Sequence, residues 1–437
     1  MLIFVASRFR SKTKMAQYFE IIGGKKLVGT IDVRGSKNAT TPILAATILT
    51  KKECILENLP LIEDVFRMIE ILESMGAKIK WLEERKISIK NEVIDPRKLD
   101  VEKIKKLRSS ILLLGSLSAR FDGFKLYHPG GCVIGKRPLG THFEAMRKMG
   151  IEISQNEKFY SVNSKKRKAT KVVLRELSVT ATENAMMLAS GMSGKTIIKI
   201  AACEPHVEDL GKFLISLGAK IEGLGTHTLK ITGSKSLRGA KHKIIPDANE
   251  AATFLIMAVA TNSSIIINNT REDHLDLVLE KLREFGADFK ISKNSIQVIP
   301  AKKLRAVSKI DPRTYPGIPS DVQAPLGVLA TQAIGDTLIF DTIFEGRFNY
   351  INELARMGAR AKILDQHQAV ISGPTKLKGK KITSFDLRAG ASLIIAGLLA
   401  DEKTIINNIY QVDRGYEKIE ERLKKLGADI KRVESIK

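Results

Sequence analysis

The hydrophobic pattern of this chain repeats six times. In each copy an amphipathic stretch ends at a glycine and continues into alternating apolar and polar residues, as in LESMGAKIKW, ISLGAKIEG and LKKLGADIKR. Because glycine readily adopts the left-handed conformation that ends a helix, each copy predicts a helix, a glycine cap and a strand. Copies at intervals of about 70 residues indicate a pseudo-symmetric fold. The glycines are Gly76, Gly150, Gly218, Gly286, Gly358 and Gly427.

A second pattern accompanies most copies. An alanine- and leucine-rich stretch without a polar face is followed by a polar turn and a β-branched stretch, as in IMAVATNSSIIINN and IIAGLLADEKTIINN. A helix that is apolar all round is buried, so we expect these helices to lie inside, between sheets. The alternation of helices and strands predicts an α/β fold.

The length of 437 residues exceeds what one hydrophobic core usually holds, so we expect two domains with three copies each. The third copy ends near residues 241–247. The first domain then spans residues 37–245, and the second spans residues 15–36 and 246–437. The strands expected within residues 18–34 could pair with either domain and are assigned to the second. In residues 1–14 an apolar run precedes the basic residues, the reverse of a signal peptide, which predicts a disordered basic tail and leaves Met15 as an alternative start.

Charge and cysteine content narrow the classes of function. The formal charge of +24 raises nucleic acid or an anionic ligand as partners. The lysines are scattered and aromatic residues are only 5%, which favours a solvated basic surface over nucleic-acid binding. Three distant cysteines, Cys54, Cys132 and Cys203, favour a reducing compartment, hence the cytoplasm, over a disulfide framework. The chain has no zinc-site spacing and no apolar run near the ~20 residues of a membrane span.

The stretch Pro129–His142, PGGCVIGKRPLGTH, has the composition of a reactive loop. Cys132 follows two glycines and precedes Lys136 and Arg137. Nearby fixed positive charge favours the thiolate, which is the reactive form of cysteine. A surface hairpin with an incidental cysteine is the alternative, and this stretch alone leaves both open.

Polar turns precede several predicted helices. RGSKNATTP places Lys37 and Asn38 at a helix start, where backbone N–H groups and a lysine can hold an anion. Arg108 precedes an apolar helix, and Ser178 precedes another. The alternatives are a capped helix with a solvated lysine, a snorkelling arginine and a simple N-cap.

The second half of the chain adds one carboxylate and three arginines in such turns. Asp321 stands in YPGIPSDVQAPL, where two prolines stiffen the approach to a helix. An N-cap role is the alternative for this aspartate. The arginines Arg347, Arg388 and Arg414 stand at corresponding places of their copies. Because a guanidinium group can donate two parallel hydrogen bonds to a carboxylate or a phosphate, these three arginines suggest convergence on a doubly anionic ligand.

Taken together, the segments GSKNA, PGGCVIGKRP, LSVTATEN, PSDVQA, FEGRF, DLRA and DRGYE resemble the UDP-N-acetylglucosamine 1-carboxyvinyltransferase family, in order over nearly the whole chain from about Tyr18. The resemblance implies a two-domain inside-out α/β barrel of six βαβαββ repeats, three per domain, as in 5-enolpyruvylshikimate-3-phosphate synthase. It implies transfer of the enolpyruvyl group of phosphoenolpyruvate to the 3-hydroxyl of UDP-N-acetylglucosamine (UDP-GlcNAc) with release of phosphate, the first committed step of peptidoglycan precursor synthesis.

The resemblance also implies residue roles. Asp321 matches the aspartate at the sugar hydroxyl, as base or orienting group, and Cys132 matches the loop cysteine that donates a proton and can bond to phosphoenolpyruvate. The cations around the phosphate match Lys37, Arg137 and Arg414. Further pocket and UDP-sugar contacts match Asn38, Arg108, Pro138, Leu139, Thr141, Ser178, Val179, Ile343, Arg347 and Arg388. The implied partners are these two small molecules, with no metal or other cofactor, no nucleic acid and no membrane. The sequence leaves the oligomeric state open, and our expectation is a monomer.

Four positions depart from the family pattern. Ala248 and Asn249 stand where Arg and Ile are commoner, Gln411 stands where a His is common, and Gly140 replaces a commonly acidic or polar residue. These positions lie outside the implied catalytic set.

Two other functions remain as alternatives. A shikimate-3-phosphate enolpyruvyl transferase would share the fold, but it lacks the loop cysteine and has Ser in place of Asn38. A non-enzymatic basic binder, motivated by the charge of +24, predicts salt-dependent affinity for any polyanion.

Overall fold

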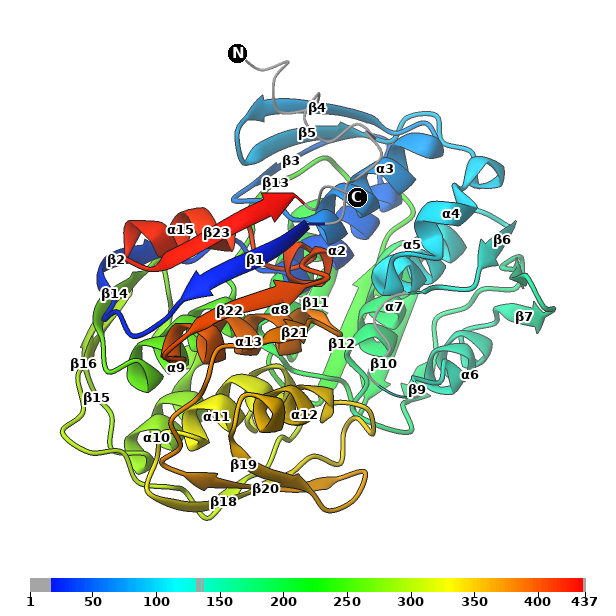
Figure 1. Cartoon of the computed structure of the whole chain (residues 1–437). Coiled ribbons are helices and arrows are strands. Elements are labelled where there is room, and N and C mark those ends of the chain that lie inside the picture. Colours follow the sequence, from blue (N-terminus) through cyan, green and yellow to red (C-terminus); the bar gives the residue numbers. More distant parts are fainter. Residues whose placement is uncertain (1–16, 131–134, 136, 435–437) are drawn as a thin grey trace. The chain divides into compact units, whose positions relative to one another are not determined.

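The structure is a computed structural model that describes residues 17–130, 135 and 137–434 (Figure 1). The predicted tail at residues 1–14 and Cys132 lie outside the described residues. The described chain forms two compact units. Unit 1 comprises residues 35–130 and 137–245, and unit 2 comprises residues 17–34, 135 and 246–434. Each unit has its own hydrophobic core.

Within the described ranges, unit 1 contains three sheets, with strand orders β13-β3-β5-β4, β11-β12-β10-β9 and β6-β8-β7. Its strands are β3 (Glu53–Glu57), β4 (Lys78–Glu83), β5 (Lys86–Lys90), β6 (Gly123–Tyr127), β7 (Glu152–Gln155), β8 (Phe159–Asn163), β9 (Lys171–Val173), β10 (Gly194–Lys199), β11 (Lys220–Glu222), β12 (Thr228–Gly233) and β13 (Lys241–Lys243). Its helices are α2 (Lys37–Ala46), α3 (Glu63–Ser74), α4 (Val101–Ile104), α5 (Leu113–Arg120), α6 (Gly140–Lys148), α7 (Val179–Ser190) and α8 (Pro205–Leu217), with the 3-10 turns η1 (Thr47–Leu49), η2 (Pro96–Lys98) and η3 (Arg108–Leu112).

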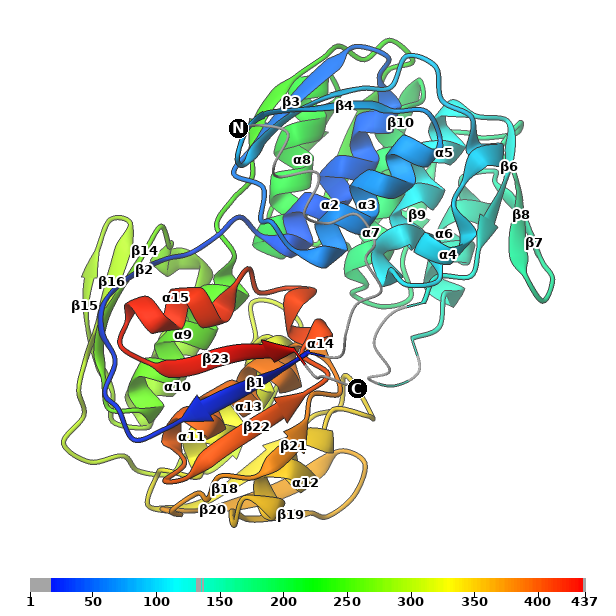
Figure 2. The ribbon, with the colours of Figure 1, turned by 45° about the horizontal axis from the view of Figure 1, so that its top comes forward.

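The described part of unit 2 also contains three sheets, with strand orders β21-β22-β1-β23, β15-β16-β14-β2 and β17-β18-β20-β19 (Figure 2). Its strands are β1 (Gln17–Ile22), β2 (Val28–Asp32), β14 (Ser264–Asn268), β15 (Asp288–Ser292), β16 (Ser295–Ile299), β17 (Lys309–Ile310), β18 (Gly335–Phe340), β19 (Arg360–Ile363), β20 (Gln368–Gly373), β21 (Lys381–Thr383), β22 (Lys403–Asn407) and β23 (Asp429–Glu434). Its helices are α9 (Ala248–Ala260), α10 (Asp276–Glu284), α11 (Gln323–Ala330), α12 (Asn349–Arg356), α13 (Leu387–Leu399), α14 (Tyr410–Asp413) and α15 (Ile419–Lys425), with the 3-10 turns η4 (Glu272–His274) and η5 (Ser320–Val322).

One pairing scheme recurs in the five four-stranded sheets of the described chain. A short edge strand runs parallel to its neighbour, and the remaining pairs are antiparallel, as where β13 pairs with β3 and β3 pairs with β5. In the sheet β21-β22-β1-β23 the second central strand is β1, the first described strand of the chain. It pairs with β22 and β23, where the other sheets use a strand from the same hairpin. Both early strands, β1 and β2, therefore belong to unit 2.

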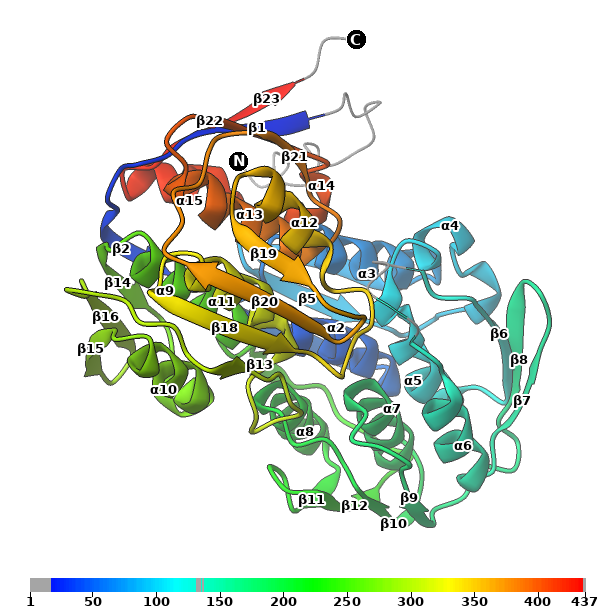
Figure 3. The ribbon, with the colours of Figure 1, turned by 60° about the horizontal axis from the view of Figure 1, so that its bottom comes forward.

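The apolar helices lie inside the units, as their lack of a polar face predicts. In α13 twelve residues, from Leu387 to Leu398, are buried, and α9 and α11 are buried along almost their whole length. Figure 3 shows strands β18 and β20 passing over α11, which they contact. In unit 1 the corresponding helices are α2, α5 and α7. No helix in the described part of the chain is long and apolar enough to cross a membrane.

The predicted glycine caps are confirmed. The six glycines have φ angles between +83° and +115°, in the left-handed region where a residue with a Cβ is strained. Each follows an amphipathic helix and precedes a strand, as where Gly218 ends α8 ahead of β11. The pattern of the sequence therefore corresponds to one structural unit repeated six times.

A second left-handed position recurs directly after a strand that has a parallel neighbour. Four such residues have φ between +53° and +62°, and they are Asn58, Ile200, Asn269 and Asn408. Asparagine tolerates this conformation, whereas a β-branched residue there is an outlier. Ile200 is also 41% exposed, so burial offers little compensation for the strain.

The three asparagines at this position tie the two parallel strands together. Each Nδ2 donates, at 2.7–2.9 Å, to the carbonyl of the residue that follows the parallel neighbour strand. Asn58, for example, follows β3 and donates to the oxygen of Ile244, which follows β13. After β10 the corresponding carbonyl belongs to Leu174, and an isoleucine cannot donate to it.

We expect Ile200→Asn to raise the free energy of unfolding by about 1–2 kcal/mol, because it relieves backbone strain and adds a hydrogen bond to Leu174. The matched reverse change, Asn58→Ile, should lower it by a similar amount. Urea denaturation followed by circular dichroism measures both. An Ile200→Asn variant that unfolds at the same or lower urea concentration than the parent would contradict this interpretation of the repeat.

Candidate functional site

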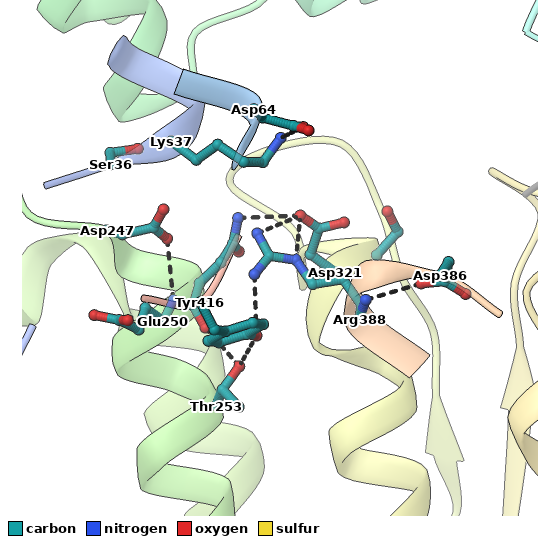
Figure 4. A network of polar contacts seen from close by, with 12 residues as sticks. Ser36, Lys37, Asp64, Asp247, Glu250, Thr253, Asp321, Asp386, Arg388 and Tyr416 are labelled. Carbon is teal, nitrogen blue, oxygen red and sulfur yellow. Dashed lines mark hydrogen bonds and ion pairs between the residues drawn. The ribbon is translucent and has the colours of Figure 1, made fainter. Parts of the chain in front are cut away.

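In unit 2 the predicted carboxylate and two of the predicted arginines meet. Asp321 lies in η5, immediately before α11. Its Oδ1 accepts a hydrogen bond from Arg347 Nη2 at 3.0 Å, and its Oδ2 accepts one from Arg388 Nε at 3.0 Å. Figure 4 shows Arg388 reaching toward Asp321. Charge-assisted bonds of this kind are strong and directional, so the carboxylate has a fixed orientation.

Arg388 is buried in the first turn of α13, with 4% of its surface exposed. The side chain of Asp386 accepts its backbone N–H at 2.8 Å and caps the helix. Burial disfavours the charge, but Tyr416, Asp321 and Asp247 outweigh that cost and raise the pKa of Arg388 above its ordinary value. Its Nη1 donates to the hydroxyl of Tyr416 at 3.0 Å. The Arg388 guanidinium is therefore a permanent cation, held in place by its hydrogen bonds to Asp321 and Tyr416.

Arg347 is held from a turn between β18 and α12. It donates to the backbone oxygen of Ser320 at 2.9 Å, and its guanidinium carbon lies 4.6 Å from the centre of the Phe344 ring. Ile343, a predicted UDP-sugar contact, belongs to the same turn and donates its N–H to Asp341 Oδ1 at 2.9 Å. The turn thus presents Ile343 and Arg347 together.

Arg414 follows α14 and is 7% exposed. Its Nη1 donates to Gln411 Oε1 at 3.2 Å. Gln411 is one of the departures from the family pattern, and here its side chain positions a predicted phosphate-binding arginine.

In unit 1, Lys37 is the first residue of α2, whose N-cap Ser36 accepts the N–H of Ala39 at 3.3 Å. Lys37 Nζ lies 3.6 Å from Asp64 Oδ2, and both side chains are largely buried. Asn38 follows and is half-buried. A lysine at a helix N-terminus, restrained by a carboxylate, is suited to hold an anion.

The other unit 1 residues of the predicted site lie on adjoining elements, because α7 packs against both η3 and α6. Arg108 begins η3 and donates to the backbone oxygen of Arg137. Pro138 and Leu139 lead into α6, whose Thr141 donates to Glu176 Oε1 at 2.7 Å. The N-cap and first residue of α7 are Ser178 and Val179.

A buried histidine, His142, joins these elements, and no motif in the sequence points to that role. Burial, reinforced by Arg108, lowers the pKa of His142 to about 3, so its imidazole is neutral. Asn184 Nδ2 lies 3.1 Å from His142 Nδ1, and its other hydrogen goes to the oxygen of Ile111. Nδ1 is therefore the acceptor, and Nε2–H donates to Thr180 Oγ1 at 3.0 Å. His142 sets the start of α7 against α6.

Glu183, on α7, is a second buried polar residue to which no sequence motif points. It is 1% exposed, and its Oε1 has no hydrogen-bond partner among the described residues. Burial, together with the charge of Glu204, raises the pKa of Glu183 well above its ordinary value, and Lys37 opposes that rise. Its protonated form is thereby favoured. Across the described residues, no group of three or more His, Cys, Asp or Glu side chains gathers as metal ligands would.

Cys132, the predicted nucleophile and acid, lies outside the described residues. The two other cysteines are buried. Burial raises the pKa of the Cys54 thiol to about 11, and burial with the nearby Glu204 raises that of Cys203. Neither has the environment of a reactive thiolate.

Comparison with known sequences relates the chain to enolpyruvyl transferases. The sequence model of the EPSP synthase (3-phosphoshikimate 1-carboxyvinyltransferase) family matches residues 21–423. A UDP-N-acetylglucosamine 1-carboxyvinyltransferase from Koribacter versatilis is 40% identical, over 95% of this chain and 96% of the relative. UDP-N-acetylglucosamine 1-carboxyvinyltransferase 1 from Carboxydothermus hydrogenoformans is 42% identical, over 95% of this chain and 98% of the relative.

Solved structures share the fold. The enolpyruvyl transferase NikO from Streptomyces tendae matches with a TM-score of 0.87 at 24% identity, over 97% of this chain and 100% of that chain. An EPSP synthase from Acinetobacter baumannii matches with a TM-score of 0.72 at 20% identity, over 95% and 100%. At these identities the likeness concerns the fold, and it confirms the predicted two-domain α/β class.

The raised pKa of Glu183 predicts a specific pH dependence of stability. The folded chain binds this proton more tightly than the unfolded chain, so stability falls as pH rises above the ordinary glutamate value of about 4.3 toward the folded pKa. Glu183→Gln, which mimics the protonated form, should therefore gain stability relative to the parent between pH 5 and pH 8. The exposed Glu222→Gln serves as control and should not change the slope. Urea midpoints across this pH range measure the effect, and parallel curves for parent and Glu183→Gln would contradict it.

Proposed function

We propose that this chain, which belongs to the EPSP synthase family and within it to the UDP-N-acetylglucosamine 1-carboxyvinyltransferases, transfers the enolpyruvyl group of phosphoenolpyruvate to the 3-hydroxyl of UDP-GlcNAc. Phosphate is released, and the product enters peptidoglycan precursor synthesis. The observation that carries the residue assignment is the Asp321 carboxylate, held by the guanidinium groups of Arg347 and Arg388.

The reaction is an addition followed by an elimination. In the first step the sugar 3-oxygen bonds to C2 of phosphoenolpyruvate, the hydroxyl loses its proton and C3 gains one. In the second step C3 loses a proton, the C2–O bond to phosphate breaks and the double bond returns. These steps need a base, an acid, cations for the phosphate and carboxylate, and exclusion of water.

We assign the base or orienting role to Asp321, because two arginines hold its oxygens in one place. Cys132 supplies the acid. Lys37, Arg137 and Arg414 hold the phosphate, and the first of these stands at a helix start that favours anions. With three cations in these roles, the charge developed on the leaving phosphate is stabilised by the protein's own side chains.

In unit 1, residues proposed to contact the UDP-sugar lie on the elements that His142 and Glu176 join, and Asn38 lies on α2. Ile343 of unit 2 is proposed as a further contact. The neutral imidazole of His142 supports this interpretation, since an uncharged buried residue can fix two helices without adding charge beside a diphosphate. Residues Pro138, Leu139, Thr141, Ser178 and Val179 line up at the starts of α6 and α7, where backbone N–H groups and hydroxyls are available.

We further propose that the enzyme is a cytoplasmic monomer. Two buried thiols and the absence of a membrane-spanning helix in the described residues are compatible with a reducing aqueous compartment. Light scattering after size exclusion would report the mass of one chain.

Phosphate release distinguishes this reaction from its alternatives. The purified protein should release phosphate from phosphoenolpyruvate with UDP-GlcNAc and not with shikimate 3-phosphate. Asp321→Asn should reduce kcat by about 10²–10⁴-fold, because an amide cannot take the hydroxyl proton. Asp336→Asn, at an exposed aspartate of β18 in the same unit, should leave kcat unchanged. Release with shikimate 3-phosphate alone would favour the related synthase, and binding of polyanions without phosphate release would favour the basic binder.

Alkylation by fosfomycin, an epoxide antibiotic, tests the thiol. The epoxide should modify Cys132 and leave Cys54 and Cys203 untouched, since burial disfavours their thiolates. Peptide mass spectrometry after incubation identifies the site, and Cys132→Ser should abolish the adduct. An unmodified Cys132 in the folded protein, or modification of the buried thiols instead, would contradict the assignment.

A further inference from the structure

Asn249, one of the departures from the family pattern, contacts the carboxylate assigned above as base. It is the second residue of α9, and its Nδ2 lies 3.3 Å from Asp321 Oδ2. That oxygen also accepts the hydrogen bond from Arg388 Nε. Asp321 is therefore restrained from α9 as well as from α13 and from the turn that carries Arg347.

A second series of hydrogen bonds also connects α9 to Arg388. The backbone oxygen of Asn249 accepts a hydrogen bond from Thr253 Oγ1, one turn further along α9, at 2.8 Å. Thr253 Oγ1 lies 2.8 Å from the hydroxyl of Tyr416, and that hydroxyl accepts from Arg388 Nη1 at 3.0 Å. Five residues thus form a closed ring, which we call the carboxylate ring, of Asp321, Arg388, Tyr416, Thr253 and Asn249. Figure 4 shows the dashed contacts that join Asp321, Arg388, Tyr416 and Thr253.

Every proton in the carboxylate ring has a determined direction. Arg388 can only donate, so the Tyr416 hydroxyl accepts a hydrogen bond from it and donates its own hydrogen bond to Thr253 Oγ1. Burial raises the pKa of Tyr416, which keeps the phenol protonated for this donation. Thr253 then donates to the backbone of Asn249, and the amide of Asn249 donates to Asp321. Arg388 Nε donates directly to Asp321 Oδ2, and Asn249 Nδ2, at the end of the longer series of hydrogen bonds, donates to the same oxygen.

We propose that Asn249 is a positioning residue for the reaction proposed above: by closing the carboxylate ring, it fixes the orientation of Asp321 and favours its ionised form. An apolar residue of similar size at this position could not donate, and the ring would be open. The inference rests on the role of Asp321 in the proposed function, but the ring itself is a property of the protein without substrate.

The charges around the ring determine the direction of its effect. Asp321 faces the cations Arg347 and Arg388, and the carboxylate of Asp247, the N-cap of α9, also interacts with Arg388. A donor removed from a carboxylate makes its protonation easier, and a new carboxylate beside it does so more strongly. Asn249→Leu should therefore move protonation of Asp321 to higher pH, and Asn249→Asp should move it further.

The experiment measures two readouts in the full-length protein. Steady-state phosphate release across pH should show a kcat about 3–10-fold lower in Asn249→Leu, with the KM for phosphoenolpyruvate unchanged, because the lost bond is one of several on this carboxylate. The acid limb of kcat/KM should move to higher pH in the order parent, Asn249→Leu, Asn249→Asp. Asn163→Leu, an exposed asparagine at the end of β8, should behave like the parent.

The second readout does not depend on catalysis. In protein labelled with ¹³C at the aspartate carboxyls, the Asp321 resonance, identified by its loss in Asp321→Asn, should titrate at higher pH in Asn249→Leu than in the parent. If the resonance titrates identically in all variants, the proposal is overturned, whatever the activity. If the resonance shifts while the parent releases no phosphate with UDP-GlcNAc, the ring stands and the proposed reaction fails. An unchanged kcat and acid limb in a folded Asn249→Leu would also overturn it.

Discussion

The ion pairs between one carboxylate and two buried guanidinium groups organise unit 2. Arg388 is 4% exposed and Arg347 is 8% exposed, and an unpaired cation at such depth would cost several kcal/mol. Asp321 removes that cost, and in return the two arginines fix the direction of its lone pairs. Folding and the proposed chemistry therefore depend on the same contacts. The contacts that stabilise unit 2 also hold the Asp321 carboxylate in a fixed position, which is what binding a substrate in one orientation requires.

The sixfold repeat explains how such a cluster forms from distant segments. Each unit is built around three buried apolar helices, and the segments that begin them contact one another, as where η5 contacts α9 and η3 contacts both α2 and α7. In unit 2 the starts of α9, α11 and α13 carry Asn249, Asp321 and Arg388. In unit 1 the corresponding starts carry Lys37, Arg108 and Ser178. Because helix N-termini favour anions, a repeat that gathers three of them suits each unit to the anion-binding role proposed above.

Much of this architecture follows from local patterns in the sequence. The left-handed glycines could be predicted because only glycine suits a cap that recurs before alternating strands, and the buried helices could be predicted because they have no polar face. The pairing of β1 with β22 and β23 could not, because a period of two identifies a strand and does not name its neighbours. For the site, the polar turns indicated Lys37 and Asp321, but not which groups surround them. In the sequence, Glu183 and His142 look like ordinary helix residues and Tyr416 like an ordinary turn residue. Burial gives Glu183 its raised pKa, and partners from distant segments orient His142 and Tyr416.

In the proposed reaction Asp321, held by Arg347 and Arg388, meets the hydroxyl that reacts. A crystal structure of the protein with UDP-GlcNAc and an unreactive phosphoenolpyruvate analogue would measure this directly. We expect an Asp321 carboxylate oxygen within about 2.6–3.2 Å of the sugar 3-oxygen, with both arginine contacts retained. A 3-hydroxyl bound beyond hydrogen-bond reach of Asp321, with no bridging water, would contradict it.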